Sequence, residues 1–518
     1  MELIKHTNLD FLNKPEHVAT LLCDFYKLSH RAQYPPNTEK VYSTWTPRGS
    51  RISRINKVVT FGHQRFVRKF LVEFFNKHFF ERPLGDILAE YDRIVTNCLT
   101  ISNPDHSHIE ALHKLGYLPL KIMAIPEGMK APIRVPTLTV ENTVAEFFWL
   151  TNYIETLFST EVWISYTSAT IAEEYRSILD KYAHKTSDIP EFVDFQGHDF
   201  SMRGHTSLES GTNSGMGHLL SFSGTDTIPA ITAMEKYYDT DVERELVGTS
   251  ISATEHSVMC SYGADKEFDT YHRLITEVYP TGFVSIVSDT WDLWKVLDEI
   301  VLPLKEEIMN RDGKVVIRPD SGDPVKILCG DPNAEDERAK KGVVQILWDI
   351  FGGEINSKGY KQLDSHIGAI YGDAITMDRA EAICEQLENN GFASTNVVFG
   401  IGSYTYQYNT RDTFGFAIKS SYVCVDGEER LIYKDPVTDD GTKKSLKGMV
   451  AVFLVDGRWH IMDELTEEKR DSFDNFNLHN IIFEDGNLYN QMSFSDIKNM
   501  LRFQRDYDFV EIKLTESE

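Results

Sequence analysis

The chain has 518 residues, of which 41% are hydrophobic and 25% charged, so it can bury a large core, and its length suits two or three domains. Its net charge of −26 would repel nucleic-acid phosphates and anionic lipids, which argues against nucleic-acid or membrane binding. Six scattered cysteines without a C-x-x-C pair argue against zinc and disulfide frameworks, and the first thirty residues resemble neither a signal peptide nor a membrane span, so we expect a cytoplasmic protein.

Residues 1–189 combine strand and helix signals. Apolar, β-branched runs predict strands at residues 41–46, 121–125 and 137–140, and helical periodicity predicts helices at residues 60–78 and 144–182. We expect this segment to form the N-terminal part of a mixed α+β domain.

Residues 190–411 carry a repeating β-α pattern. Short apolar runs at residues 284–287, 315–317, 367–370 and 397–399 each end in polar or glycine residues, and helical stretches follow at residues 293–304 and 377–387. Three further strands are expected at residues 192–195, 219–222 and 247–251, and a charged surface loop at 331–341. The pattern predicts an irregular α/β barrel with its polar strand ends around one mouth. The alternative, an open doubly wound sheet, would gather the same ends along one edge.

Residues 412–518 are rich in strand and hairpin signals. Alternating runs at residues 416–425, 431–434 and 450–455 are separated by the Asp426-Gly427 and Asp456-Gly457 turn sequences. We expect this β-rich part to pack with residues 1–189. The predicted fold class is therefore α/β, an irregular α/β barrel with a second mixed, largely antiparallel β domain formed by the N- and C-terminal segments.

No P-loop, zinc-protease or EF-hand motif is present, so the strand ends remain the candidate site. Short motifs in a fixed order resemble the nicotinamide phosphoribosyltransferases, which are type II phosphoribosyltransferases, over nearly the whole chain: Asp24-Phe25-Tyr26-Lys27, Gln33-Tyr34-Pro35-Pro36-Asn37-Thr38, Pro126-Glu127-Gly128, Val140-Glu141-Asn142-Thr143, His198-Asp199-Phe200, Gly224-Thr225-Asp226-Thr227, Glu255-His256-Ser257, Ser288-Asp289, Ile317-Arg318-Pro319-Asp320-Ser321-Gly322 and Gly372-Asp373. The resemblance implies a pentosyltransferase of NAD salvage that joins nicotinamide to phosphoribosyl pyrophosphate and releases pyrophosphate.

The resemblance also implies a nicotinamide site. Asp226 would accept a hydrogen bond from the carboxamide and repel the carboxylate of nicotinate. Phe200 and Tyr26 would stack on the ring, with Tyr26 coming from the other subunit of a homodimer, and Arg203 would meet ring and phosphates. Ser250 and Ser285 are further predicted substrate-binding residues. The residues alone leave other roles open. Asp226 could cap a helix, Phe200 and Tyr26 could be core residues, and Arg203 could be a surface ion-pair partner.

For the phosphorylated sugar, the resemblance implies contacts from Arg318, with Asp320 and Asp373 on the ribose hydroxyls. Backbone N–H groups of Gly372, Gly402 and Ser403 would approach the 5′-phosphate. A glycine-rich run is expected after Gly402, but Ser403 and Tyr404 follow it, so the shape of this loop is open. For Gly400 and Gly402 a role in turn formation alone is the alternative.

Pyrophosphate would be bound by Arg411, Lys419 and one lysine among Lys443, Lys444 and Lys447 of the partner subunit, with Mg²⁺ bridging its oxygens. The metal ligands are not indicated by the sequence.

His256 resembles a histidine that ATP phosphorylates, with Glu255 or Asp289 as the acceptor that orients its ring. A purely structural histidine is the alternative. For the whole protein, two other functions stay open: a nicotinate phosphoribosyltransferase on the same fold, and a catalytically silent sensor of nicotinamide or its nucleotide.

Overall fold

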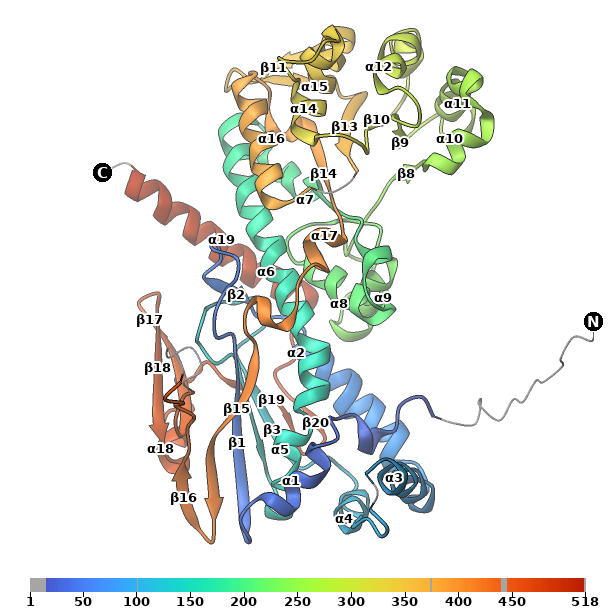
Figure 1. Ribbon diagram of the computed structural model, residues 1–518. Coiled ribbons are helices and arrows are strands. Elements are labelled where there is room, and N and C mark those ends of the chain that lie inside the picture. The colour runs from blue at the N-terminus through green and yellow to red at the C-terminus, as the bar shows by residue number, and fades with distance from the viewer. Residues whose placement is uncertain (1–14, 100, 373–374, 439–444, 517–518) are drawn as a thin grey trace, which may run out of the picture. The chain divides into compact units, whose positions relative to one another are not determined.

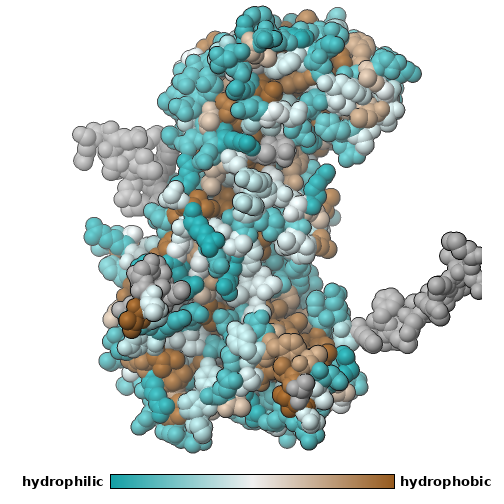
Figure 2. Space-filling model, in the orientation of Figure 1, coloured by the Kyte–Doolittle hydropathy of each residue, from teal (hydrophilic) through white to brown (hydrophobic). Residues whose placement is uncertain are grey.

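The computed structural model describes residues 15–99, 101–372, 375–438 and 445–516, with side chains up to residue 506. The chain divides into two compact units. Unit 1 comprises Met1–Trp163 and Arg411–Met492, and unit 2 comprises Ile164–Thr410 and Ser493–Glu518. The visible surface in Figure 2 is mostly hydrophilic, with scattered apolar patches. Among the helices of the described residues, none has both the length and the apolar character needed to cross a bilayer.

Unit 1 is built on a seven-stranded antiparallel sheet in the order β16-β15-β1-β5-β3-β19-β20 (Figure 1). The strands are β1 (Thr38–Thr46), β3 (Leu120–Ala124), β5 (Leu138–Asn142), β15 (Ala417–Val425), β16 (Glu428–Leu431), β19 (Asn480–Glu484) and β20 (Asn487–Leu488). Because β1 lies between β15 and β5, both ends of the chain contribute to one sheet. The predicted mixed, largely antiparallel domain is confirmed.

The two Asp-Gly turns form as the sequence predicts. Asp426 and Gly427 have φ of 53° and 73° between β15 and β16. Asp456 and Gly457 have φ of 50° and 74° between β17 (Met449–Val455) and β18 (Arg458–Leu465). Two consecutive left-handed residues suit the right-handed twist of a two-residue hairpin, and glycine adopts this conformation without steric cost.

The remaining elements of unit 1 are mainly helices. They are α1 (Lys27–Gln33), α2 (His63–Phe66), α3 (Leu84–Leu99), α4 (Ser107–Leu115), α5 (Leu150–Tyr153) and α18 (Glu467–Asp471), with the short strands β2 (Lys57–Val59) and β4 (Lys130–Pro132). The helix predicted at residues 60–78 begins at His63 and continues after α2 as the π-helical segments η3 (Val67–Phe74) and η4 (Asn76–Phe80).

Unit 2 contains a parallel sheet in the order β7-β6-β14-β13-β10-β9-β8. The strands are β6 (Gly197–Asp199), β7 (Gly224–Thr225), β8 (Ser252–Ala253), β9 (Val284–Val287), β10 (Val315–Arg318), β13 (Ile367–Tyr371) and β14 (Val397–Ile401). A parallel bridge joins Gly224 of β7 to Thr249, just before β8, and so connects the two ends of the sheet. This closure makes the sheet an irregular barrel and confirms the predicted fold class.

The helices of unit 2 include α6 (Glu155–Thr186), α7 (Val193–Gln196), α8 (Leu208–Leu219), α9 (Ile228–Tyr237), α10 (His256–Tyr262), α11 (Glu267–Arg273), α12 (Leu293–Lys295), α13 (Lys305–Met309), α14 (Pro324–Cys329), α15 (Glu337–Phe351), α16 (Met377–Asn389), α17 (Ser403–Tyr406) and α19 (Phe494–Glu516). The division between the units falls within α6 rather than at residue 190, and α19 belongs to unit 2 rather than to the β-rich part. In unit 2, Arg505 of α19 bonds Glu173 of α6 at 2.6 Å.

Three of the predicted strands and the predicted surface loop differ from the structure in their position or type. Residues 192–195 lie in helical turns and residues 219–222 at the end of α8, so β6 and β7 begin a few residues later. Residues 247–251 contribute only the bridge at Thr249. The strands that form instead, β6, β7 and β8, are two or three residues long. They contain Gly, His, Asp, Thr, Ser and Ala, so they lack an apolar run. Within 331–341, α15 begins at Glu337 because Asp336 caps the Arg338 N–H at 2.8 Å.

Candidate active site

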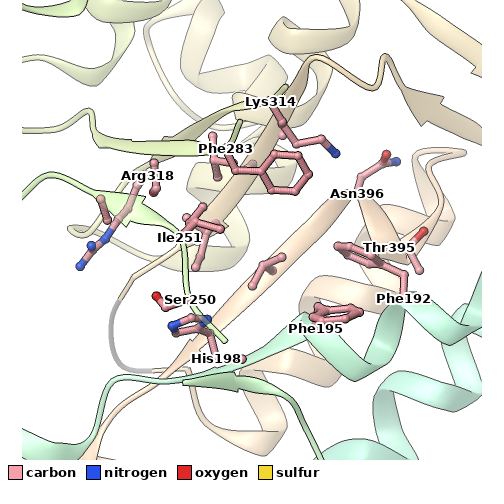
Figure 3. A pocket seen from close by; sticks show the side chains of 18 of the residues that line it. Phe192, Phe195, His198, Ser250, Ile251, Phe283, Lys314, Arg318, Thr395 and Asn396 are labelled. Atoms are coloured by element: carbon pink, nitrogen blue, oxygen red, sulfur yellow. The ribbon is translucent and has the colours of Figure 1, made fainter. Parts of the chain in front are cut away.

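A cavity of about 430 Å³ occupies the interior of the unit 2 barrel (Figure 3). Its lining includes His198, Phe200, Asp226 and Arg318 at the carboxyl ends of strands, and Ser250, which lies between the bridge residue Thr249 and β8. It continues past Ser285, Val316 and Ala369 to Lys314, Gln362 and Asn396 near the amino ends. In Figure 3, His198 and Ser250 lie at one end of the pocket and Lys314 and Asn396 at the other. The structure therefore brings Phe200, Asp226, Ser250 and Ser285 to one cavity, whereas the predicted Arg203 does not line it.

Asp226 follows β7 and lies at the mouth of the cavity, with its side chain 49% exposed. Its Oδ1 accepts hydrogen bonds from Ser250 Oγ at 2.5 Å and from His198 Nε2 at 2.9 Å. Burial opposes ionisation of the carboxyl, but these two hydrogen bonds and the charges of His198 and Arg318 lower the pKa of Asp226. The mouth of the cavity therefore presents an ionised carboxylate whose Oδ2 is not used by either bond. Sequence reasoning did not assign a site role to His198.

Ser285 lies deeper, on β9, and is buried. Its Oγ has no hydrogen-bond partner among the described residues although it lines the cavity. A buried, unpaired hydroxyl costs free energy unless a ligand or water bonds it. Ser285 can therefore bind a polar group of a ligand inside the barrel.

Phe200 provides an aromatic surface beside these polar groups. Its ring centroid lies 4.5 Å from that of His198, and the Arg318 guanidinium carbon lies 5.0 Å from the Phe200 centroid. Phe200 is partly buried and lines the cavity, so it is not simply a core residue. The site thus offers an aromatic face and a cation to a flat ligand.

The β10 end carries Arg318 and Asp320 next to Gly372, which follows β13. A Cβ on Gly372 would lie 2.3 Å from Asp320 Oδ1 and 2.7 Å from Arg318 Nε, so only glycine allows these side chains their positions. Asp289 accepts from the Asp320 N–H at 2.9 Å and from Ser321 Oγ at 2.6 Å, and it thereby fixes the turn after β10. Asp373 lies outside the described residues.

His256 begins α10 and is half-exposed. Its Nδ1 lies 3.2 Å from Thr290 Oγ1, and its Nε2 lies 3.8 Å from Asp320 and 3.9 Å from Asp289. The group at Nδ1 is therefore Thr290, which the sequence did not indicate. Neither predicted acceptor orients the ring through Nδ1. Asp289 faces Nε2, and Glu255 accepts a hydrogen bond from Ser257 Oγ.

The predicted phosphate loop follows β14, where Gly402 is the residue before α17. Ser403 and Tyr404 continue directly into this short helix, so the loop is helical at the position where a glycine-rich run is expected. Arg203 is exposed, and no hydrogen bond or ion pair is recorded for it in the described part of the chain. Arg203 is thus not an ordinary surface ion-pair partner here.

Unit 1 carries a separate basic cluster, made of Lys27, Arg48, Lys419 and Lys434. Burial, together with the charges of Arg48, Lys434 and Lys27, lowers the pKa of Lys419, against the opposing charge of Glu155. Three cations surround the exposed Lys419, although one of them, Lys27, pairs with Glu155, and the excess of positive charge favours an anionic ligand. Arg48 and Lys434 were missed in the sequence because they come from distant segments.

The other predicted residues of unit 1 are placed as follows. Tyr26 is 58% exposed, so it is not a core residue. Arg411 is half-exposed and lies 3.6 Å from Asp412. Lys447 pairs with Glu464 at 3.5 Å, whereas Lys443 and Lys444 lie outside the described residues.

Comparisons with known proteins agree with this geometry. The model of the nicotinate phosphoribosyltransferase family matches residues 195–482, and the model of the nicotinamide phosphoribosyltransferase N-terminal domain matches residues 19–83. A nicotinamide phosphoribosyltransferase of Acinetobacter baylyi is 50% identical over 93% of this chain and 96% of its own length. One from Mycoplasma pneumoniae is 37% identical over 83% of this chain and 94% of its own.

Among solved structures, a nicotinate-nucleotide pyrophosphorylase of Pyrococcus furiosus is similar with a TM-score of 0.53, at 14% identity over 95% of this chain and 97% of that one. At this identity the likeness concerns the fold alone. The sequence matches go further, and they show that this chain belongs to the nicotinamide phosphoribosyltransferases within the nicotinate phosphoribosyltransferase family, and is a pentosyltransferase enzyme.

Proposed function

We propose that this enzyme joins nicotinamide to phosphoribosyl pyrophosphate, forming nicotinamide mononucleotide and pyrophosphate in NAD salvage. The observation that carries the proposal is the ionised Asp226 at the mouth of an otherwise largely apolar cavity. A carboxylate accepts hydrogen bonds and suits a carboxamide N–H, whereas it repels the carboxylate of nicotinate. Ser285 Oγ is a candidate donor to the carboxamide oxygen. The names of the two relatives agree with this substrate choice.

The reaction needs alignment more than covalent chemistry. The pyridine nitrogen attacks the anomeric carbon of the sugar, the bond from that carbon to the pyrophosphate oxygen breaks, and the electron pair leaves with pyrophosphate. The nitrogen lone pair is free, so no general base is required. Asp320, and Asp373 by resemblance, would hold the ribose hydroxyls and stabilise positive charge on the sugar, while Arg318 would bind substrate beside them.

Mg²⁺ would neutralise charge on the departing pyrophosphate. Among the described residues, no three His, Cys, Asp or Glu side chains form a group that could hold a metal ion. This suits Mg²⁺, which often uses one or two carboxylates and takes its other ligands from phosphate and water. Asp289 fits as such a ligand, because its Oδ1 is buried without a hydrogen-bond partner in the described structure.

We further propose a homodimer with shared active sites. The exposed Tyr26 ring would cover the nicotinamide of the other subunit, and Arg411, Lys419 and a lysine of the 443–447 segment would reach its pyrophosphate. The basic cluster around Lys419 supports a polyanion site in unit 1. The backbone of Gly372, Gly402 and Ser403 would bind the 5′-phosphate, with Arg203 nearby. Cytoplasmic location remains a prediction from the sequence.

ATP is proposed to phosphorylate His256. Thr290 holds Nδ1, and Nε2 is the nitrogen that faces the cluster of Asp289 and Asp320. Nε2 would attack the γ-phosphorus of ATP, the bond to the bridging oxygen would break, and ADP would leave.

Incubation of the purified protein with nicotinamide, phosphoribosyl pyrophosphate and Mg²⁺, with and without ATP, tests the function. We expect nicotinamide mononucleotide and an equal amount of pyrophosphate, and a much slower reaction with nicotinate. Absence of the mononucleotide, or faster turnover of nicotinate, would refute the proposal.

A further inference from the structure

The loop after β6 and the loop after β14 are in direct contact. Gly204, in the first loop, touches Ser403 in the second: a Cβ on Gly204 would lie 2.0 Å from Ser403 Oγ and 2.4 Å from Ser403 Cβ. The first loop carries Phe200 and Arg203, and the second carries Gly402 and Ser403. The proposed base-binding and phosphate-binding loops therefore pack against each other without room for a side chain at residue 204.

His205 links the same two loops by hydrogen bonds. Its Nδ1 lies 2.9 Å from Gln407 Oε1, and its Nε2 lies 3.1 Å from Ser201 Oγ. Since the amide oxygen of Gln407 only accepts, Nδ1 carries the proton and donates. Gln407 Oε1 also accepts from the Thr206 N–H at 3.3 Å, and the Gln407 N–H donates to Ser403 O at 2.7 Å. One glutamine thus joins the first loop to the backbone of Ser403.

On the Nε2 side of His205 lies Ser201, which is bonded to the buried Asp199 of the barrel. Ser201 Oγ and N–H both bond Asp199 Oδ1, at 2.6 Å and 2.9 Å. Asp199 is fully buried at the end of β6, and its Oδ2 accepts from Thr227 Oγ1 at 2.7 Å. Asp199 is held by two neighbouring strand ends, so it fixes the loop after β6 at Ser201. The single Ser201 Oγ proton goes to Asp199, so the 3.1 Å approach of Ser201 Oγ to His205 Nε2 is a contact and not a second donated bond. The link from this loop to the loop after β14 is therefore the His205–Gln407 hydrogen bond.

We propose that His205 is a positioning residue: by bonding Gln407 it holds the loop Gly402–Gln407 in register with the base-binding loop, so that the phosphoribosyl group and nicotinamide are aligned for reaction. The inference rests on the proposed function. His205 is not expected to touch substrate. Its loss should weaken binding of phosphoribosyl pyrophosphate more than binding of nicotinamide, because Phe200, Asp226 and Ser285 remain in place.

Four variants test this: His205→Ala, Gln407→Ala, the double variant, and His205→Asn, whose amide nitrogen can replace Nδ1. We expect the KM for phosphoribosyl pyrophosphate to rise about 3- to 10-fold in each alanine variant, as for loss of one hydrogen bond. The KM for nicotinamide should change less than about twofold, because the residues proposed to contact nicotinamide keep their hydrogen bonds. The double variant should be no worse than Gln407→Ala, which removes the bond to His205 together with the bond from the Thr206 N–H. His205→Asn should recover most of the loss seen in His205→Ala.

His366→Ala is the matched control, because this histidine also bonds through Nδ1, to Asp364 at 2.7 Å, but precedes β13 at the opposite end of the barrel. Both KM values should stay unchanged in it. Equal changes in both KM values in His205→Ala, or additive effects in the double variant, would overturn the inference while leaving the proposed function intact.

Hydrogen exchange provides a readout that does not need turnover. Backbone amides of residues 402–407 should exchange faster in His205→Ala and Gln407→Ala than in the wild type or in His366→Ala. Unchanged exchange in this loop would overturn the positioning role, whereas a wild-type protein that forms no mononucleotide would overturn the proposed function instead.

Discussion

Replacement of Asp226 by alanine should convert a nicotinamide-selective enzyme into a weakly selective one. A hydrogen bond to a charged group contributes roughly 1.5–3 kcal/mol. Because 1.4 kcal/mol corresponds to a tenfold change, kcat/KM for nicotinamide should fall by about 10- to 150-fold. The variant also frees Ser250 Oγ and His198 Nε2, which both bond Asp226 Oδ1 in the wild type. These donors can then face the carboxylate of nicotinate, so turnover of nicotinate should rise.

The measurement is steady-state kinetics with both bases at saturating phosphoribosyl pyrophosphate and Mg²⁺, with separation of the two mononucleotide products. Asp226→Asn is the matched variant, because it keeps the shape and an acceptor oxygen for Ser250 but removes the charge. It should accept nicotinate better than the wild type does and retain more nicotinamide activity than Asp226→Ala. A variant that folds normally and keeps the wild-type ratio of kcat/KM values would refute the base-reading role of Asp226.

Three other changes test separate parts of the structure. His256→Ala should abolish stimulation by ATP but retain basal synthesis, and full ATP stimulation in this variant would disprove the phosphohistidine proposal. Gly372→Ala should reduce kcat/KM at least tenfold with little change in the free energy of unfolding, because its Cβ would displace the Arg318 and Asp320 side chains; wild-type kinetics would contradict this. Burial, with the nearby charge of Asp292, raises the pKa of Glu267 from 4.5 to about 7. The folded protein therefore holds a proton on Glu267 that the unfolded chain loses above pH 4.5, so stability falls as the pH rises from 4.5 to 7. Glu267→Gln should flatten this decline in urea titrations across that range, and an unchanged slope would contradict the assignment.

The sequence predicted the long elements well and the short ones poorly. Strands β10, β13 and β14 contain apolar runs of three residues, β9 has three apolar residues out of four, and each strand lies within two residues of its predicted position. Strands β6, β7 and β8 have no such run. Their pairing depends on neighbours distant in the sequence, which local periodicity does not detect.

In the candidate site, the sequence identified single residues but not the contacts between them. Resemblance supplied Asp226, Arg318 and His256, and the barrel places them at the ends of different strands. The hydrogen bonds that set their chemistry, from His198 to Asp226 and from Thr290 to His256, join residues 28 and 34 positions apart. Such pairings depend on how the strand ends meet, so a single sequence does not reveal them.

The small side chains inside the barrel connect this fold to its proposed chemistry. In a typical α/β barrel, layers of Val, Ile and Leu fill the interior. Here the small residues Ala253 on β8, Ser285 on β9 and Ala369 on β13 line a cavity of about 430 Å³. Empty apolar volume costs packing energy, so the cavity lowers the stability of the barrel at the place where, under the proposed function, a ring would enter. Around the mouth, buried Asp199 bonds Ser201 and Thr227 and so fixes the strand ends that carry Phe200 and Asp226. A hollow interior and a polar rim are therefore parts of one arrangement, in which, under the proposed function, the rim would hold the substrate groups and the cavity would accept the base.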